Sequence, residues 1–499
     1  MRGTWGPLGG LLIALWLLPA PAVADTLIER APALGTIHKF ETYLADVRLR
    51  LYARESDTRK EAFKLVQRSI KEAKADGDAD FALRLLGDVL LGVGLPSGTQ
   101  LNEDLQESAL ELLSDTAKDR DLSLSLREAA LAQIVRITAG RPPANADVRD
   151  DGYDVLAKLS EDRALILAHG SLAALGAVAA SRESGWSGKR SKAASTIVDR
   201  LEDDALELRR AAFLVAVHVL RGMREKDSVA AKLWEELEDA AEAIKSPAFY
   251  ADVAPQLRTL IDQQRGTPYA GPAADVKKRL DAFDGKLEPM QSPFPEVLRS
   301  VSEGAGRVDL ERALQRIGAD ALRDGTRQLL GFSAIAARAA RRDTPSDELR
   351  LLDDALVRLA QSDDSALPYF RLCAVLLEQA FQRRERGDSH LPLAQLARLL
   401  AATDSAALVL PVLNEIRSQA LAPEQPVWVA KRLIGLLFLQ AGDSPGAPLR
   451  AHAMEQLERI GQNAERWALR QEVWVRMQQL QQHARDADVK ARAKAWLGG

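Results

Sequence analysis

Histidine is the side chain most often used in proteins for proton transfer and for metal binding, so the six histidines of this chain are its first candidates for chemistry. They are His38, His169, His218, His390, His452 and His483. None of them follows the H-x-H, H-x-x-x-H or E-x-x-H spacing that would place two metal ligands on one face of a helix. The sequence therefore predicts no metal site and no cofactor. His218 lies in the apolar run LVAVHVL, and we predict that it is a buried, hydrogen-bonded core histidine.

Two aspartate-rich segments are similar to parts of a calcium-binding loop. They are Asp76–Asp80 and Asp147–Asp154. The first has Gly87 where a calcium loop needs its bidentate Glu, and the second has Arg149 at a ligand position and Lys158 at the twelfth position. We interpret both as acids that begin helices or lie in loops.

The signatures of nucleotide-dependent and nucleophilic enzymes are missing from the sequence. There is no G-x-S-x-G and no G-x-G-x-x-G, and Gly188-Lys189 is followed by Arg190 where a Walker loop needs Ser or Thr. Cys373 is the only cysteine, so the chain can form no internal disulfide. We predict that Cys373 is a packing residue and no nucleophile.

One segment resembles the active-site region of an enzyme family. Arg182-Glu183-Ser184-Gly185-Trp186 is similar to the segment around the catalytic glutamate of soluble lytic transglycosylases, which are periplasmic enzymes that carry a large α-superhelix. The resemblance implies that Glu183 would protonate a glycosidic oxygen and then act as a base, in an apolar setting that raises its pKa. The G-L-M-Q motif that should follow is missing, and the segment runs directly into repeat sequence. We predict that Glu183 is a solvated loop acid, and a peptidoglycan-acting enzyme or enzyme subunit is the alternative function.

The first 24 residues have the pattern of a secretory signal peptide. Arg2 precedes the apolar run Leu11–Leu18, and Ala22-Val23-Ala24 forms an A-x-A cleavage site. The run is far shorter than the roughly 20 apolar residues that a membrane-spanning helix needs. We therefore expect cleavage before Asp25, no membrane span in the mature chain, and a periplasmic or secreted location.

The composition excludes several classes of protein. The 499 residues are 46% apolar and 28% charged, which is typical of a globular chain and not of a disordered one. The formal net charge is −4 at pH 7, and removal of Arg2 with the signal peptide makes it one unit more negative. Because nucleic-acid binding needs a basic surface that neutralises phosphates, we expect no nucleic-acid partner.

Helix-forming residues recur at intervals of three and four along the chain, whereas alternating β-branched runs are missing, so we predict an all-α fold. The segment that begins at Ser346 shows the pattern, because Ser346 can cap a helix whose apolar side chains share one face. These apolar side chains are Leu349, Leu352, Leu356 and Leu359. The other face is left to water and carries Arg350, Asp353, Asp354 and Arg358. We expect breaks between helices at 92–98, 140–152, 265–272, 284–295, 422–426 and 442–448.

A repeat runs through most of the chain. Its unit has an apolar residue, often followed by a base, then a compact residue four positions on and an aliphatic or small residue eight positions on. The first residues of these units are Leu83, Leu126, Leu167, Leu208, Phe249, Leu329, Tyr369, Leu408, Leu449 and Val489. Their intervals are 43, 41, 41, 41, 80, 40, 39, 41 and 40, and the interval of 80 equals two periods of 40.

A period near 40 residues with two helices in each unit is typical of helical solenoids. The chain resembles HEAT or armadillo-type arrays, most clearly in SLREAALAQIV, LELRRAAFLVAV, PLRAHAMEQLERI and DADVKARAKAWL. We predict an α-solenoid of stacked antiparallel helix pairs, with arrays over 25–283 and 296–499. The skipped unit coincides with the proline-rich segment 284–295, which is either a hinge between two half-arrays or a long surface loop.

Four tryptophans lie near the C-terminus, at Trp428, Trp467, Trp474 and Trp496. They could line a groove for a partner or close the core at the end of the array. The resemblance to HEAT-type arrays implies a concave face that holds a protein or peptide partner. The sequence thus predicts an exported, non-enzymatic scaffold of the cell envelope with no catalytic, cofactor-binding or metal-binding residues, and a plain structural spacer is a further alternative.

Overall fold

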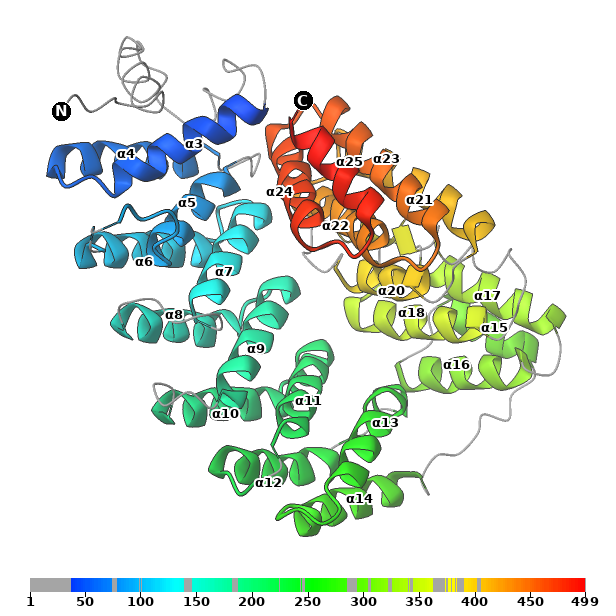
Figure 1. Ribbon diagram of the computed structural model, residues 1–499. Coiled ribbons are helices and arrows are strands. Elements are labelled where there is room, and N and C mark those ends of the chain that lie inside the picture. The colour runs from blue at the N-terminus through cyan, green and yellow to red at the C-terminus, as the bar shows by residue number, and fades with distance from the viewer. Residues whose placement is uncertain are drawn as a thin grey trace, which may run out of the picture.

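The structure is a computed structural model, and the part of the chain that it describes is built of helices and their connections (Figure 1). The described residues are 37–498 except 74–78, 98, 100, 139–145, 182–186, 224, 243, 245–246, 285–293, 304–306, 322–324, 340, 342–343, 362–372, 374–375, 378, 382, 384–389 and 402–404. The predicted signal peptide, residues 1–24, lies outside them. None of the described helices has the length and apolarity that a bilayer crossing needs.

The described part of the first half is a succession of helices. They are α3 (Ile37–Leu51), α4 (Ser56–Glu72), α5 (Asp80–Leu90), α6 (Glu103–Lys118), α7 (Leu124–Thr138), α8 (Ala146–Leu159), α9 (Leu165–Ala180), α10 (Ser187–Leu201), α11 (Leu206–Arg221), α12 (Ser228–Glu242), α13 (Pro247–Gln263) and α14 (Ala270–Asp284).

The second half continues the series. Its described helices are α15 (Phe294–Glu303), α16 (Arg307–Ala321), α17 (Gly325–Ala339), α18 (Ser346–Gln361), α20 (His390–Ala401), α21 (Ala406–Leu421), α22 (Val427–Asp443), α23 (Ala447–Asn463), α24 (Trp467–His483) and α25 (Ala487–Gly498). The expected break at 422–426 separates α21 from α22 at the expected residues. The break expected over 140–152 extends too far, because α8 already begins at Ala146. Gly152 lies inside α8 and packs against Thr138.

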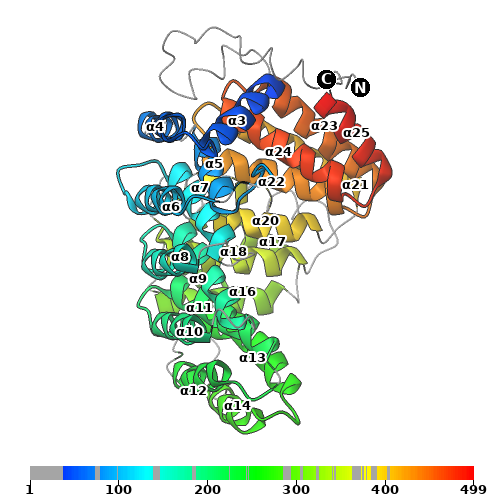
Figure 2. The same cartoon turned by 60° about the vertical axis from the view of Figure 1, so that its left-hand side comes forward.

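The helices stack in two layers, so that the chain is an α-solenoid. Odd-numbered helices of the first half pack on odd-numbered ones, as α5 does on α7 and α9 on α11, while α10 packs on α12 and α12 on α14. Figure 2 shows the column formed by α6, α8, α10, α12 and α14. Most helices also pack on the helix next to them in sequence, which makes the antiparallel pairs that the repeat predicts.

The compact residue of the repeat lies where neighbouring helices of one layer approach each other. Gly87 of α5 leaves no space for a larger residue, because a Cβ atom there would overlap the Gln133 side chain of α7. Ala130, Ala212 and Ala453 occupy the same repeat position and are fully buried. A larger side chain at this position would force the two helices apart.

In two units, the base that follows the first apolar residue joins its unit to the next. Arg127 donates to the Ala117 carbonyl at 3.0 Å and pairs with Asp162 at 2.5 Å, and Asp162 in turn accepts a hydrogen bond from the Ala164 amide. Arg450 pairs with Asp486 in the same way, at 2.6 Å. In these two units the basic residue is therefore structural.

The two layers exchange their roles in the middle of the chain. The odd-numbered helix α13 packs on the even-numbered helix α16, across the predicted break at 284–295. As a result, the odd-numbered layer of the N-terminal half and the even-numbered layer of the C-terminal half face each other (Figure 1). Residues 285–293 lie outside the described part, so the hinge and the long surface loop both stay predictions.

The two halves meet again at the opposite end, along a contact that we call the closing seam. It is made by Phe40, Glu41, Asp80 and Glu128 from the N-terminal half with Lys431, Arg432, Trp467 and Gln471 from the C-terminal half. Lys431 pairs with Asp80, and Arg432 pairs with Glu128. The array therefore closes on itself, with α24 beside α3 and α5 (Figure 1).

The seam has an apolar contact and a partly buried acid as well as ion pairs. The rings of Phe40 and Trp467 lie 5.8 Å apart between their centroids, and Phe40 is fully buried. Burial raises the pKa of the Glu128 carboxyl, Arg432 opposes that rise, and the nearby Glu472 adds to it. Removal of Arg432 would leave this partly buried acid beside Glu472 without its partner, which is unfavourable.

Asp354 does not face water as the local pattern predicts. The leucine stripe of α18 is buried as expected, but Asp354 accepts a hydrogen bond from Gln395 at 2.9 Å and lies 3.8 Å from the guanidinium of Arg210 in the N-terminal half. The prediction was wrong for Asp354, because Gln395 and the Arg210 side chain of the N-terminal half lie against it and leave its side chain only 20% exposed, whereas Arg358 is exposed as predicted.

Substitution of the compact residue tests the close approach of neighbouring helices. We expect Ala453→Leu to lower the free energy of unfolding by about 1–3 kcal/mol, because the added methylene groups overpack a fully buried position. Urea unfolding followed by circular dichroism measures this change. Ala451→Leu, on the exposed side of the same helix, is the matched control and should stay within about 0.5 kcal/mol of the wild type.

Charge reversal tests the closing seam. We expect Lys431→Glu combined with Arg432→Glu to separate the halves, because both new acids would face Asp80 and Glu128. Small-angle X-ray scattering should then give a larger radius of gyration with unchanged helix content. The control is Lys490→Glu with Lys494→Glu, which changes the net charge equally at exposed positions of α25. An unchanged radius of gyration in the seam variant would contradict the closed arrangement.

Candidate functional site

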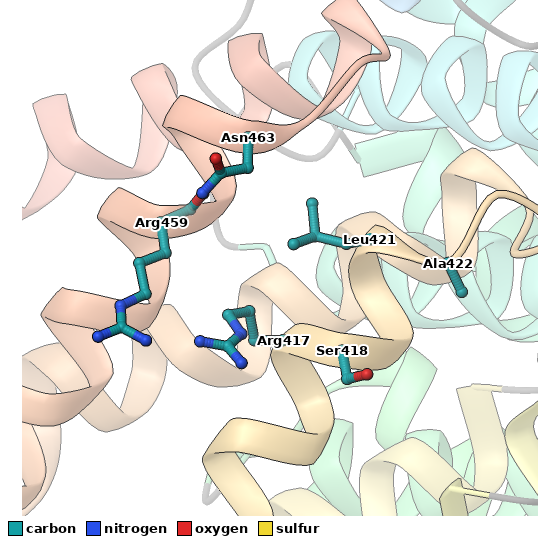
Figure 3. A pocket seen from close by; sticks show the side chains of 6 residues that line it. All are labelled: Arg417, Ser418, Leu421, Ala422, Arg459 and Asn463. Atoms are coloured by element: carbon teal, nitrogen blue, oxygen red, sulfur yellow. The ribbon is translucent and has the colours of Figure 1, made fainter.

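A pocket lined by two arginines opens between α21 and α23, on the layer of the C-terminal half that faces away from the N-terminal half (Figure 3). We call it the cation pocket. Its volume is about 640 Å³, and its lining residues are Arg417, Ser418, Leu421, Ala422, Arg459 and Asn463. The described lining residues include no Asp or Glu, so the pocket presents positive charge beside an apolar patch.

The repeat itself positions the two arginines. Arg417 follows the fully buried Ile416 on α21, and Arg459 precedes the fully buried Ile460 on α23. Each arginine therefore lies at the boundary of the helix face that enters the core, and the stacking of α21 on α23 brings the two together. Figure 3 shows Arg417 and Leu421 extending toward α23 and Arg459 extending from α23 into the same space.

The two arginines differ in how they are held. Arg459 pairs with Glu455, one turn earlier on the same helix. Arg417 has no hydrogen bond or ion pair within the part of the chain that the structure describes. Its charge is therefore available to a ligand, whereas that of Arg459 is shared.

The pKa of His452 depends on the electrostatic potential beside the pocket. Its imidazole bonds to Asn414 at 3.0 Å and lies 3.6 Å from Glu455. Burial lowers the pKa of His452, Glu455 opposes this, and Arg459 and Arg417 lower it further. The cations of the pocket thus act on a group that can be titrated.

The pocket lies at the C-terminal ends of its helices, where backbone carbonyls carry partial negative charge. Side-chain donors also reach three carbonyls near these helix ends. Arg466 donates to the carbonyls of Gln425 at 2.5 Å and Ala422 at 3.4 Å, and the Asn463 amide donates to the carbonyl of Arg459 at 2.8 Å.

A second pocket, of about 420 Å³, lies between α6 and α8 in the N-terminal half. It contains more acids than bases: its charged lining residues are Glu107, Glu111, Lys118, Asp151, Asp154 and Lys158. Burial lowers the pKa of Lys118, Lys158 adds to this, and Asp115 opposes it. The two pockets thus carry opposite charge and lie in different halves of the molecule.

A polar cluster lies on the inner faces of the two halves. It includes His169 of α9, Arg210 of α11 and Asp354 of α18. Burial lowers the pKa of His169 to about 4, a backbone hydrogen bond at Glu207 opposes this, and Arg210 adds to it. His169 is therefore neutral near pH 7. Neither of the two pockets described above opens onto this cluster.

The histidine that the sequence places in the core, His218, is exposed. It lies on the outward stripe of α11 with Ala211, Leu214 and Arg221, because successive turns of the helix return every three or four residues to that face. The apolar neighbours of His218 in sequence point elsewhere, so the prediction was wrong. His169 is instead a histidine whose ring enters the interior, with its Nε2 atom fully covered.

The other residues with candidate chemistry have packing roles or lie outside the described part. Cys373 is buried, as predicted. Arg190 donates to the Ala179 carbonyl and pairs with Asp227 at 2.6 Å. Glu183 lies outside the described residues, and so do positions 76–78 of the first aspartate-rich segment. Within the described ranges, no group of three or more His, Cys, Asp or Glu residues could hold a metal ion.

The C-terminal tryptophans lie mainly in the core. Trp428 and Trp474 are buried, and Trp474 packs against Trp496 with 6.0 Å between the ring centroids. Trp467 belongs to the closing seam, and its other neighbour is the guanidinium of Arg470. These contacts favour the interpretation that the tryptophans close the core at the end of the array. Trp467 does so by packing against α3.

No protein-family model matches the chain, and no curated protein sequence matches it. Solved structures of HEAT or armadillo-type solenoids are similar over most of its length, at low identity. A chain of the AP-3 complex in an intermediate open conformation is 10% identical over 95% of this chain and 94% of that chain, with a TM-score of 0.31. A microtubule polymerase with TOG domain arrays, in a structure of tubulin recruitment, is 12% identical over 90% and 99%, with a TM-score of 0.29.

A third similar structure comes from work on the interaction between cadherin and β-catenin, at 13% identity over 91% and 99% of the two chains and a TM-score of 0.23. The helix packing described above, and not these scores, establishes the α-solenoid fold.

The pKa of His452 tests the potential of the cation pocket. We expect Arg417→Gln to raise this pKa, because a cation beside the imidazole disfavours its protonated form. An NMR titration of the imidazole resonances measures the change. Arg265→Gln, at an exposed arginine of the N-terminal half, should leave the pKa of His452 unchanged. If Arg417→Gln also leaves it unchanged, the assigned position of Arg417 is wrong.

Proposed function

We propose that the protein is an exported, non-enzymatic scaffold of the cell envelope that binds a protein or peptide partner. The observation that carries this proposal is the cation pocket, in which two adjacent repeat units present Arg417 and Arg459 beside Leu421. Arginine stays protonated in proteins, so it serves recognition and electrostatic stabilisation and does not transfer protons. The chemistry of this pocket is that of a binding surface.

The closing seam supports docking on the outward layer. The inner layers of the two halves contact each other through Lys431 and Asp80 at one end and through α13 and α16 at the other. A partner that entered between the halves at either end would have to displace these contacts, whereas the cation pocket lies on the outward layer. This argues for a partner on the outside of the solenoid and against the concave face that the sequence suggests.

The proposal of export and an envelope location rests on residues 1–24, which combine Arg2, the apolar run Leu11–Leu18 and an A-x-A site. The signal pattern is also compatible with the alternative function, a peptidoglycan-acting enzyme with Glu183 as its general acid. The scaffold is preferred because the repeat continues on both sides of Glu183, through α9 and α10.

Crosslinking in the native envelope tests the proposal. The full chain with a C-terminal tag is expressed in its own host, crosslinked, fractionated and purified, and its partners are identified by mass spectrometry against the untagged strain. We expect the tagged chain outside the cytoplasm, without residues 1–24, and crosslinked in stoichiometric amount to one protein. Deletion of residues 2–24 is the matched control, and it should retain the chain in the cytoplasm without that partner.

Two results would overturn the proposal. One is retention of the full chain in the cytoplasm. The other is release of soluble glycan fragments from purified sacculi by the purified chain, with loss of that release in Glu183→Gln, which would establish the enzyme instead.

A further inference from the structure

Resting on the proposed function, we infer that the cation pocket binds an acidic segment of the partner, with an Asp or Glu carboxylate between Arg417 and Arg459 and a neighbouring aliphatic side chain on Leu421 and Ala422. This names the chemistry of the partner and the helices, α21 and α23, that receive it.

The charge of the pocket selects an anionic ligand. Two guanidinium groups and no described carboxylate line it, and Arg417 has no partner of its own within the described residues. An arginine without an ion pair is stabilised when a carboxylate reaches it, because charge-assisted hydrogen bonds are about twice as strong as neutral ones. The planar fork of a guanidinium matches the two oxygens of a carboxylate.

The rest of the lining selects a peptide over a small free anion. A volume of about 640 Å³ falls within the range of roughly 300–1,000 Å³ that holds drug-sized ligands, far more than one phosphate ion would occupy. Leu421 and Ala422 add an apolar patch that a hydrated inorganic anion could not use. Ser418 and Asn463 supply polar groups of the kind that bind a peptide backbone.

A second copy of this chain is the competing occupant, because the pocket between α6 and α8 carries an excess of acids. That pocket also contains Lys118 and Lys158, which offset part of its charge. An extended acidic segment without such bases complements the cation pocket better. We therefore assign the pocket to a different chain, and the oligomeric state enters the test.

Peptide binding to the purified mature chain tests the inference. The probe is a fluorescein-labelled peptide of twelve residues in which each Glu-Leu pair is followed by Gly. The control peptide has Gln in place of each Glu. We expect fluorescence anisotropy to show saturable binding of the Glu peptide, at least ten-fold weaker binding of the Gln peptide, and weakening with added salt. Binding of the two peptides with equal affinity would overturn the assignment of a carboxylate.

Variants locate the bound peptide. Arg417→Glu should weaken binding at least ten-fold and Arg417→Gln by a smaller factor, whereas Arg265→Glu, which changes the net charge as much as Arg417→Glu at a remote exposed position, should change it less than two-fold. Circular dichroism and the urea midpoint establish that each variant is folded. Equal weakening by Arg417→Glu and Arg265→Glu would show attraction to net charge alone and would overturn the site.

Three further readouts separate the competing occupants. Saturating peptide should raise the pKa of His452, because a bound carboxylate offsets the neighbouring cations, and an unchanged pKa would overturn the location. Inorganic phosphate at the concentration of the peptide should not displace it, and equal competition would make this a site for small anions. Sedimentation should give a monomer, and an oligomer dissolved by Arg417→Glu would assign the pocket to a second copy.

The failure of this inference is distinguishable from the failure of the proposed function. If the envelope crosslinking yields one partner and Arg417→Glu leaves that partner bound, the scaffold stands and the assigned pocket is wrong. If the peptide binds as expected but the chain stays in the cytoplasm, the pocket stands and the envelope function is wrong.

Discussion

The fold depends on the close approach of helices in neighbouring units. A helix pair of this chain cannot bury its apolar faces by itself, because the side chains that fill its core come from the units before and after it. The approach is close enough that a Cβ atom on Gly176 of α9 would lie 2.5 Å from Val215 of α11. The compact repeat residues Ala130 and Ala453 follow from the same constraint, and their recurrence in each unit makes the period near 40 visible in the sequence. The arginine–aspartate pairs of the repeat then add a polar connection between successive units.

A stack of repeats has two ends, and an end unit lacks the neighbour that would cover its apolar face. Here the first and last described units cover each other in part. Phe40 of α3 is fully buried with Trp467 of α24 against it, and Gln471 bonds to Glu41 at 2.8 Å. The exchange of layers between α13 and α16 makes this possible, because it turns the two halves face to face. Self-closure thus does what dedicated capping repeats do in open arrays, and it covers the ends of inner faces that an open solenoid would leave exposed.

The elements that depend on local pattern, such as the buried leucine stripe of α18, could be predicted from the sequence. The closing seam could not, because Asp80 and Lys431 are 351 positions apart and no periodicity connects them. His218 is a different case, since the helical period was available and an apolar stretch of sequence was mistaken for a buried face. The candidate site could be predicted only in part: the units that begin at 408 and 449 each carry an arginine in the second half of their first helix, Arg417 nine and Arg459 ten positions after the first residue. The spacing cannot tell that only Arg459 has a described ion-pair partner, because that difference depends on side-chain geometry.

The cation pocket and the closing seam are joined by one helix. The helix α22 packs on both α21 and α23, which form the pocket, and it carries Lys431 and Arg432 to the N-terminal half. A solenoid transmits force through such nearest-neighbour contacts, because each unit touches only the units beside it. In an open array the pocket would be linked to the N-terminal half only through the whole stack. In the closed array, the single helix α22 connects the pocket to the N-terminal half. The units that carry the pocket therefore have contacts with both halves.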